Sequence, residues 1–166
     1  MFGHSVGLIE VLILGVAGIA VVTDLRRRRI YNVLTMPAML AGLALNTVMD
    51  GFSGLGWALA GFGLGAALFF IPVALGGMGA GDLKLLAALG AIGGPGFVFW
   101  CAIYTSIVGG ALGVAMLLSR RQFIPVFGPM VLSVTLKQMP RATSNIRLPY
   151  AVPIAVGAVT ALMLNS

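Results

Sequence analysis

The chain has 166 residues, of which 60% are hydrophobic and only 8% are charged. This composition excludes an ordinary soluble domain, in which about a quarter of the residues are charged. The formal net charge is +6, but in so apolar a chain we expect the basic residues to set topology and to meet anionic lipid rather than nucleic acid. We therefore expect residues 1–166 to form a single domain that crosses a membrane several times.

Apolar runs in chain order predict an all-α membrane protein with six helices. The fourth run holds only ten residues, which rise about 15 Å, roughly half of the hydrocarbon core. That short helix could extend through the glycines after it, lie shielded among the other helices, or begin from backbone that dips into the membrane. The predicted helices cover residues 6–23, 33–49, 55–75, 83–92, 97–118 and 148–164.

The basic residues predict how the helices are oriented. All ten Lys and Arg residues fall in alternate connections, namely 24–32, 76–84 and 119–147, whereas the connections 50–54 and 93–96 hold none. Because basic residues accumulate in cytoplasmic loops, this pattern predicts six transmembrane helices in a cell membrane with both termini on the non-cytoplasmic side. The stretch 122–147 is interrupted by prolines, and within it 131–139 could be a helix lying on the inner leaflet or part of a loop.

Small residues indicate where helices meet. Gly61 and Gly65, like Gly109 and Gly113, are four residues apart, the spacing that lets two backbones approach closely in a bilayer. The alternative is that glycine is simply common in membrane helices. The single cysteine, Cys101, lies in an apolar run and is expected to be a small core residue.

The stretch from Gly76 to Lys84 combines four glycines with Asp82, one of only four acidic residues in the chain. A carboxylate is costly near a bilayer, so an acidic residue there is by default a candidate for function. The local alternative is a helix cap, because Asp82 precedes a good helix-forming sequence and could accept hydrogen bonds from its first backbone N–H groups.

Asp24 is the other acidic residue expected at the cytoplasmic face, since Glu10 and Asp50 fall on the opposite side of the predicted topology. Taken alone, Asp24 could pair with one of the arginines from Arg26 to Arg29. Two carboxylates a few Å apart cannot both ionise comfortably and therefore share a proton. One can then take a proton from a water that attacks an amide, while the other donates to the carbonyl oxygen. This is aspartic peptidase chemistry, and it needs neither metal nor cofactor.

The same residues resemble a known family. The sequence Gly79-Ala80-Gly81-Asp82, followed by Lys84, is similar to the G-x-G-D motif of the type IV prepilin peptidases. Asp24 with the downstream Ile30-Tyr31-Asn32 resembles that family's first aspartate and its Ile-Pro-Asn, with Tyr31 where the family has proline. The segment 148–153 before the last helix is also similar to the family pattern, and the order of the motifs is the same.

The resemblance implies an integral membrane aspartic endopeptidase that removes the short basic leader of pilin-like or flagellin-like precursors at the cytoplasmic face. Asp24 and Asp82 would be the catalytic pair. The size resembles the minimal branch that serves tight-adherence (Flp) pili or archaeal preflagellins. Larger relatives carry an extra region with paired cysteines and also N-methylate the product, and this chain lacks those cysteines, which argues against methylation. The supporting motif residues would be Gly79, Gly81, Lys84 and Asn32.

Two other functions are compatible with parts of this pattern. Presenilin-like proteases share a G-x-G-D motif, but their first aspartate follows a tyrosine and a later Pro-Ala-Leu is present, whereas here Thr23 precedes Asp24 and no Pro-Ala-Leu occurs. A small transporter or channel subunit is the non-enzymatic alternative, because short helices and glycine breaks also mark transport sites. The placement of both aspartates at one face rather than at mid-membrane argues against transport.

Overall fold

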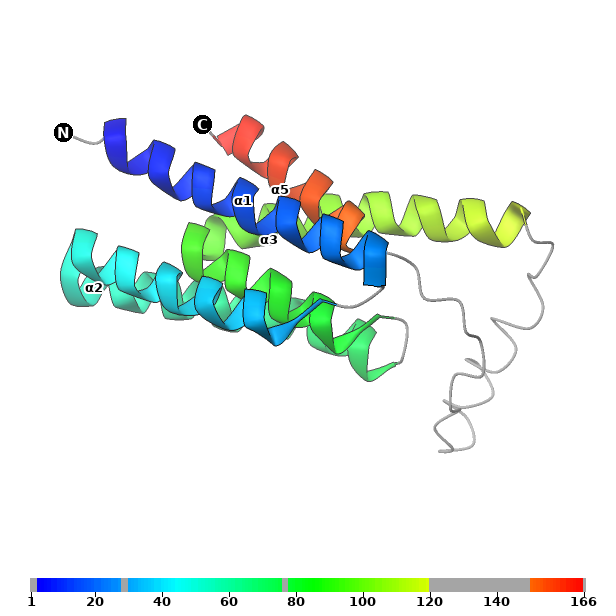
Figure 1. Cartoon of the computed structure of the whole chain (residues 1–166), viewed down its shortest axis with the longest axis horizontal. Coiled ribbons are helices and arrows are strands. Elements are labelled where there is room, and N and C mark those ends of the chain that lie inside the picture. Colours follow the sequence, from blue (N-terminus) through cyan, green and yellow to red (C-terminus); the bar gives the residue numbers. More distant parts are fainter. Residues whose placement is uncertain (1–2, 28–29, 76–77, 120–149, 166) are drawn as a thin grey trace.

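The computed structural model describes residues 3–27, 30–75, 78–119 and 150–165, and these form an all-helical bundle (Figure 1). Three of the described helices, α1, α2 and α3, are long and apolar enough to cross a membrane, and α5 is a shorter apolar helix. The predicted class, an α-helical membrane protein, is therefore confirmed. The helices are α1 (Gly3–Arg27), α2 (Asn32–Ala74), α3 (Ala80–Ser119) and α5 (Ala151–Asn165).

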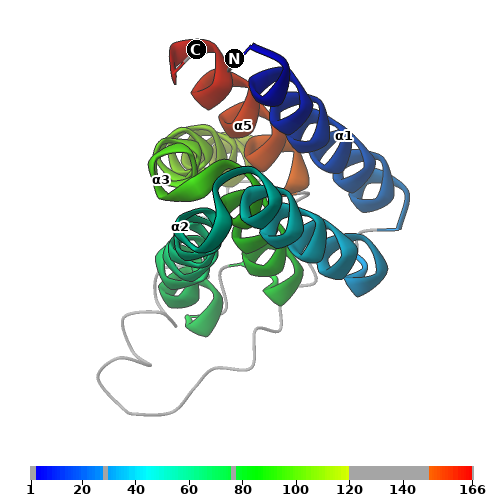
Figure 2. The same ribbon diagram turned by 90° about the vertical axis from the view of Figure 1, so that its left-hand side faces the viewer.

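Two of these helices fold back on themselves at a glycine (Figures 1 and 2). In α2 the break is at Gly51, with φ 62°, and in α3 it is at Gly94, with φ 80°. These positive φ angles suit glycine, which has no Cβ to clash. Each long helix is thus two arms, and the breaks lie within the predicted connections 50–54 and 93–96. The number of membrane crossings and the side on which each terminus lies remain predictions.

The first arm of α3 is the centre of the bundle. Every residue from Leu85 to Ile92 is buried, so this arm is covered on all sides by the rest of the protein. Helices that are apolar all round are buried helices. Of the alternatives for the short fourth helix, shielding among the other helices is therefore confirmed, although the helix begins at Ala80, three residues earlier than predicted.

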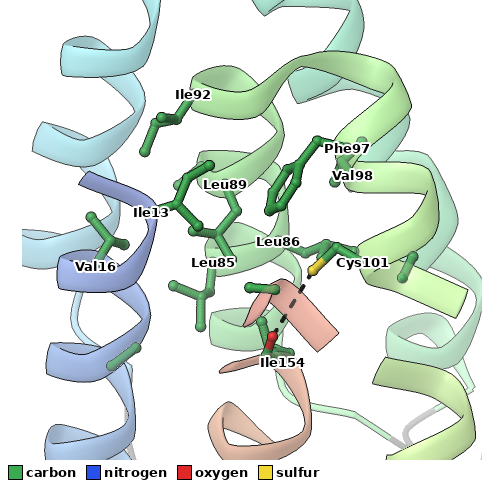
Figure 3. Packing of buried hydrophobic residues seen from close by; sticks show 14 of the residues in the cluster. Ile13, Val16, Leu85, Leu86, Leu89, Ile92, Phe97, Val98, Cys101 and Ile154 are labelled. Carbon is green, nitrogen blue, oxygen red and sulfur yellow. Dashed lines mark hydrogen bonds between the residues drawn. The ribbon is translucent and has the colours of Figure 1, made fainter. Parts of the chain in front are cut away.

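Side chains from several helices pack around this arm, as Figure 3 shows. Ile13 and Val16 come from α1, and Ile154 comes from α5. Cys101 lies in the same cluster, completely buried, with its thiol 3.9 Å from the Ile154 carbonyl oxygen. The expectation that Cys101 is a small core residue is confirmed.

The buried side-chain amide of Asn46 forms hydrogen bonds to backbone carbonyls at the break in α3. The side chain of Asn46 donates hydrogen bonds to the carbonyl oxygens of Ala91, at 3.1 Å, and Ile92, at 3.1 Å. A regular helix would bond the Ala91 carbonyl to the N–H of residue 95, but Pro95 has none. Asn46 therefore supplies donors that the interrupted helix lacks, at a place where an unpaired carbonyl would be costly.

Glycines set the distance between the two long helices. A Cβ atom on Gly61 would overlap the backbone carbonyl oxygen of Gly90, and one on Gly65 would lie 2.9 Å from the carbonyl oxygen of Leu86. The prediction that Gly61 and Gly65 allow close helix packing is confirmed. The second pair behaves differently, because a Cβ on Gly113 would meet nothing within 4 Å in the described part of the chain.

The outer surface of the bundle is apolar. Phe52 is 92% exposed, Val48 85% and Val33 83%, and each described helix also presents large hydrophobic side chains outward. A soluble monomer rarely exposes so much contiguous apolar surface. Lipid is the environment that suits it. The stretch 122–147, including the predicted interfacial helix at 131–139, lies outside the described residues.

Candidate active site

Four helix ends meet at one end of the bundle. The last turn of α1 and the first turns of α2, α3 and α5 lie there, on the right in Figure 1. Two hydrogen bonds join these ends in pairs. Ala151 N–H of α5 donates to Asp24 of α1, and Lys84 of α3 donates to Asn32 of α2. Every residue singled out from the sequence as a site candidate comes from these four ends. The Gly51 break, with Asp50 beside it, lies at the opposite end.

Asp82 lies in the first turn of α3 and is buried, with 8% of its surface exposed. Its Oδ2 accepts a hydrogen bond of 3.0 Å from the N–H of Gly79, and its own N–H donates to the Gly79 carbonyl at the same distance. A side chain that reaches back in this way satisfies an N–H that the helix leaves unpaired. The predicted N-cap position is therefore wrong, because Asp82 lies inside the first turn of α3 and caps the N–H of Gly79, which precedes the helix.

Asp24 lies in the last turn of α1 and is 6% exposed. Its Oδ2 accepts a hydrogen bond of 3.2 Å from the N–H of Ala151, the first residue of α5. The carboxylate thus stands at a helix N-terminus, where the macrodipole favours negative charge. No ion pair with an arginine is formed among the described residues, and Arg26 and Arg27 are exposed while Asp24 is buried.

The two carboxylates share one electrostatic environment. The charge of Asp24 acts on Asp82, and the charge of Asp82 acts in turn on the phenol of Tyr150. Burial and, secondarily, the nearby Asp82 carboxylate raise the pKa of Tyr150 above its usual value. Residues distant in sequence, Asp24, Asp82 and Tyr150, thus lie within reach of one another's charge. Two buried carboxylates at one end of a bundle are suited to exchange a proton with a bound substrate.

The supporting motif residues position the start of α3. Lys84 Nζ donates a hydrogen bond of 2.9 Å to Asn32 Oδ1, which joins the first turns of α3 and α2. Gly81 packs on the residue that leads into α2, because a Cβ there would lie 3.1 Å from the Cβ of Ile30. From the sequence, Lys84 was expected only as a supporting motif residue. Its hydrogen bond to Asn32 was not predicted.

Sequence reasoning missed the contribution of Tyr150 and Ala151. The segment 148–153 was singled out only as a pattern, although its position directly before a helix was a signal that backbone N–H groups would be free to bind a carboxylate. Residues 148 and 149 lie outside the described residues. Within the described ranges, no group of three or more His, Cys, Asp or Glu side chains is arranged to hold a metal ion.

The contact between Gly79 and Asp82 leads to a prediction. A Cβ on Gly79 would lie 3.0 Å from Asp82 Oδ2, closer than ordinary packing, so Gly79→Ala must displace the carboxylate slightly. Because a misplacement of about 1 Å can cost about 100-fold in rate, we expect this smaller shift to lower kcat/KM for the predicted peptidase reaction about tenfold, as measured by substrate cleavage. Gly96→Ala is the control, since nothing lies within 4 Å of a Cβ there. A wild-type rate for Gly79→Ala would show that the position of Asp82 is unimportant.

Comparison with known proteins gives two matches. A model of the type IV leader peptidase family matches residues 11–114, a range that includes both aspartates. The prepilin leader peptidase/N-methyltransferase of Aeromonas hydrophila is 35% identical over 116 residues, which cover 64% of this chain and 40% of that protein. The matched part is thus less than half of that curated relative. No solved structure matches the chain significantly.

Proposed function

Because this chain belongs to the type IV leader peptidase family, we propose that it is a membrane aspartic endopeptidase that cuts the short basic leader from a prepilin-like or preflagellin-like precursor. Asp24 and Asp82 are the catalytic pair in this proposal. Gly79, Gly81, Lys84 and Asn32 hold the start of α3 in place. The product is expected to leave without N-methylation.

One observation carries the proposal: two buried aspartates, one in the last turn of α1 and one in the first turn of α3, lie at the same end of the bundle. Each is held through Oδ2 by a backbone N–H, that of Ala151 for Asp24 and that of Gly79 for Asp82. These backbone N–H groups hold each carboxylate in position, and because they carry no net charge they do not neutralise it. The second oxygen of each carboxylate has no hydrogen bond to another described residue, which suits it to contact water or substrate.

The reaction follows from this arrangement. The ionised aspartate takes a proton from a water molecule, whose oxygen attacks the carbonyl carbon of the scissile amide. The protonated aspartate donates its proton to the carbonyl oxygen, and a tetrahedral diol forms. The C–N bond then breaks as the aspartate that took the water's proton donates it to the amide nitrogen, while a hydroxyl proton of the diol passes to the other aspartate; this leaves a new carboxyl group on the leader and a new amine on the mature protein. The two aspartates end with one shared proton, as they began.

The proposal also includes a place in the cell. We infer that the chain crosses the cell membrane six times with both termini on the non-cytoplasmic side, and that the aspartates face the cytoplasm. The distribution of the basic residues supports this orientation. Anionic lipid is the expected neighbour of those residues. Residues 1–166 act together as one membrane domain.

The test is cleavage of a precursor by the purified protein in liposomes. A prepilin-like substrate with a basic leader is incubated with the protein across a range of pH, and the products are identified by mass spectrometry. We expect one cut between leader and mature part, an unmethylated new N-terminus, and a rate that falls both when the pair is fully protonated and when it is fully ionised. If no prepilin-like or preflagellin-like precursor is cut by a well-folded preparation, the proposal is wrong.

A further inference from the structure

A cavity of about 300 Å³ lies between the start of α5 and the second arm of α3. We name it the α3 cavity; it is bounded by Met78, Tyr150 and residues of the second arm of α3 between Thr105 and Val114. Figure 1 shows this arm continuing past the first residues of α5. The volume is at the lower end of the range typical of ligand pockets in proteins, about 300–1,000 Å³.

Two walls of the cavity are joined directly to the residues that hold the aspartates. Met78 precedes Gly79, whose N–H donates to Asp82. Tyr150 precedes Ala151, whose N–H donates to Asp24. Along the chain, the α3 cavity is therefore one residue away from the backbone donor of each carboxylate. Among the residues that bound the cavity, Tyr150 has a phenol whose pKa is raised by burial and, secondarily, by the charge of Asp82.

The opposite wall of the cavity is suited to an apolar ligand. The hydroxyl groups of Thr105 and Ser106 donate to carbonyl oxygens of their own helix, those of Cys101 at 2.6 Å and Ala102 at 2.7 Å. Their hydrogen-bonding capacity is thus partly used within α3.

The glycines of this wall leave room. A Cβ on Gly110 or Gly113 would meet nothing within 4 Å, and one on Gly109 would make ordinary contact with Tyr150 at 3.5 Å. Space is available there because side chains are missing, and glycine surfaces let another peptide approach closely in a membrane.

We propose that the α3 cavity is a substrate subsite that binds an apolar side chain of the precursor next to the bond that is cut, with Met78 and Tyr150 as its inner walls. This inference rests on the proposed function, and it adds a site that would determine which residue the peptidase accepts beside the scissile bond. An apolar residue is the chemistry that fits, because the cavity lies between apolar helices and a charged side chain there would be costly.

The test measures specificity with substitutions that fill the cavity. Gly110→Leu and Gly113→Leu place a large side chain in open space, so neither should disturb the packing of the described residues. Gly63→Leu is the matched control, because a Cβ on this exposed residue of α2 also meets nothing within 4 Å, yet it does not line the cavity. The substrates are precursors in which one residue beside the scissile bond is either Phe or Ala. The residue before the bond and the residue after it are varied separately.

For wild type and Gly63→Leu we expect a preference for Phe over Ala at one of these positions. In Gly110→Leu and Gly113→Leu, kcat/KM for that Phe precursor should fall about tenfold or more, because a pocket that has lost the space for a side chain discriminates by this order. Cleavage of the matching Ala precursor should change much less. A preference that is the same in all variants at every position overturns the subsite while leaving the peptidase itself intact.

A second readout does not depend on turnover. A precursor with a photoreactive apolar residue beside the scissile bond is cross-linked to the Asp82→Asn variant, and the attachment point is mapped by mass spectrometry. Attachment at Met78, Tyr150 or the second arm of α3 supports the subsite, even if the precursor is not a substrate. Attachment elsewhere from every tested position overturns it, and the α3 cavity is then filled by lipid or by the protein itself.

Discussion

Asp24→Asn and Asp82→Asn are each expected to lower kcat/KM for precursor cleavage by about 10²–10⁴-fold, the range supplied by general acid–base groups. Asparagine has nearly the same shape as aspartate, and its amide oxygen can still accept the hydrogen bond from Ala151 or Gly79. The caps of α5 and α3 should therefore persist. What is lost is the ability to take up and release a proton, which the proposed reaction needs from both side chains.

The control for this prediction is Asp50→Asn. Asp50 is exposed and lies beside the Gly51 break, at the opposite end of the bundle from the aspartate pair. Its substitution should leave cleavage unchanged. Thermal unfolding in detergent should give similar midpoints for all three variants and the wild type. If Asp24→Asn or Asp82→Asn folds normally and cleaves at close to the wild-type rate, that residue acts only as a helix cap.

Gly61→Ala is expected to be the most damaging small substitution for the fold. The backbones of α2 and α3 meet at Gly61 and Gly90, and a Cβ on either glycine would overlap the carbonyl oxygen of the other. Backbone atoms cannot move aside as a flexible side chain can, so the two helices must separate. We expect a loss of about 3 kcal/mol in the free energy of unfolding, the upper end for overpacked sites, measured by denaturant titration in mixed micelles.

Gly63→Ala is the matched control in the same arm of α2. A Cβ on Gly63 would meet nothing within 4 Å. Because alanine also favours helix more than glycine does, Gly63→Ala should be neutral or slightly stabilising. Equal stability of Gly61→Ala and Gly63→Ala would mean that the close contact between α2 and α3 is not a feature of the folded protein.

Much of the fold could be predicted from the sequence because a membrane imposes simple rules on composition. Apolar runs predicted the helical segments. The glycine-rich stretches at 50–54 and 93–96 predicted the positions at which α2 and α3 break. The role of Asn46 could not be foreseen, because it depends on which carbonyls are left unpaired by the break at Gly94 and by Pro95, which has no N–H. Nor could a pattern of spacing alone tell Gly61, which contacts a neighbouring backbone, from Gly113, which borders a cavity.

The candidate site was predicted in part for a similar reason. Asp24 and Asp82 stand out because acidic residues are rare in this chain, and the structure brings them to one end of the bundle. Their backbone partners do not stand out. Ala151 is far from Asp24 in sequence and contributes only an N–H group, which any residue but proline would offer. Tyr150 became a candidate only when its neighbours in space were known.

The central claim is that residues 24 and 82 converge on one water-accessible site. Its most direct test uses a variant in which Cys101, the only cysteine, is replaced by alanine. Asp24→Cys and Asp82→Cys are introduced together in that background, and a short bifunctional thiol reagent is applied in liposomes. Asp24→Cys with Asp50→Cys serves as the comparison pair.

We predict that the reagent bridges positions 24 and 82 within one chain, as identified by the mass of the linked peptides, and that it does not bridge positions 24 and 50. The contradicting result is equally clear. If the thiols at positions 24 and 82 each react singly with the reagent but are never joined by it, the two side chains do not share a site, and a shared-proton mechanism is excluded.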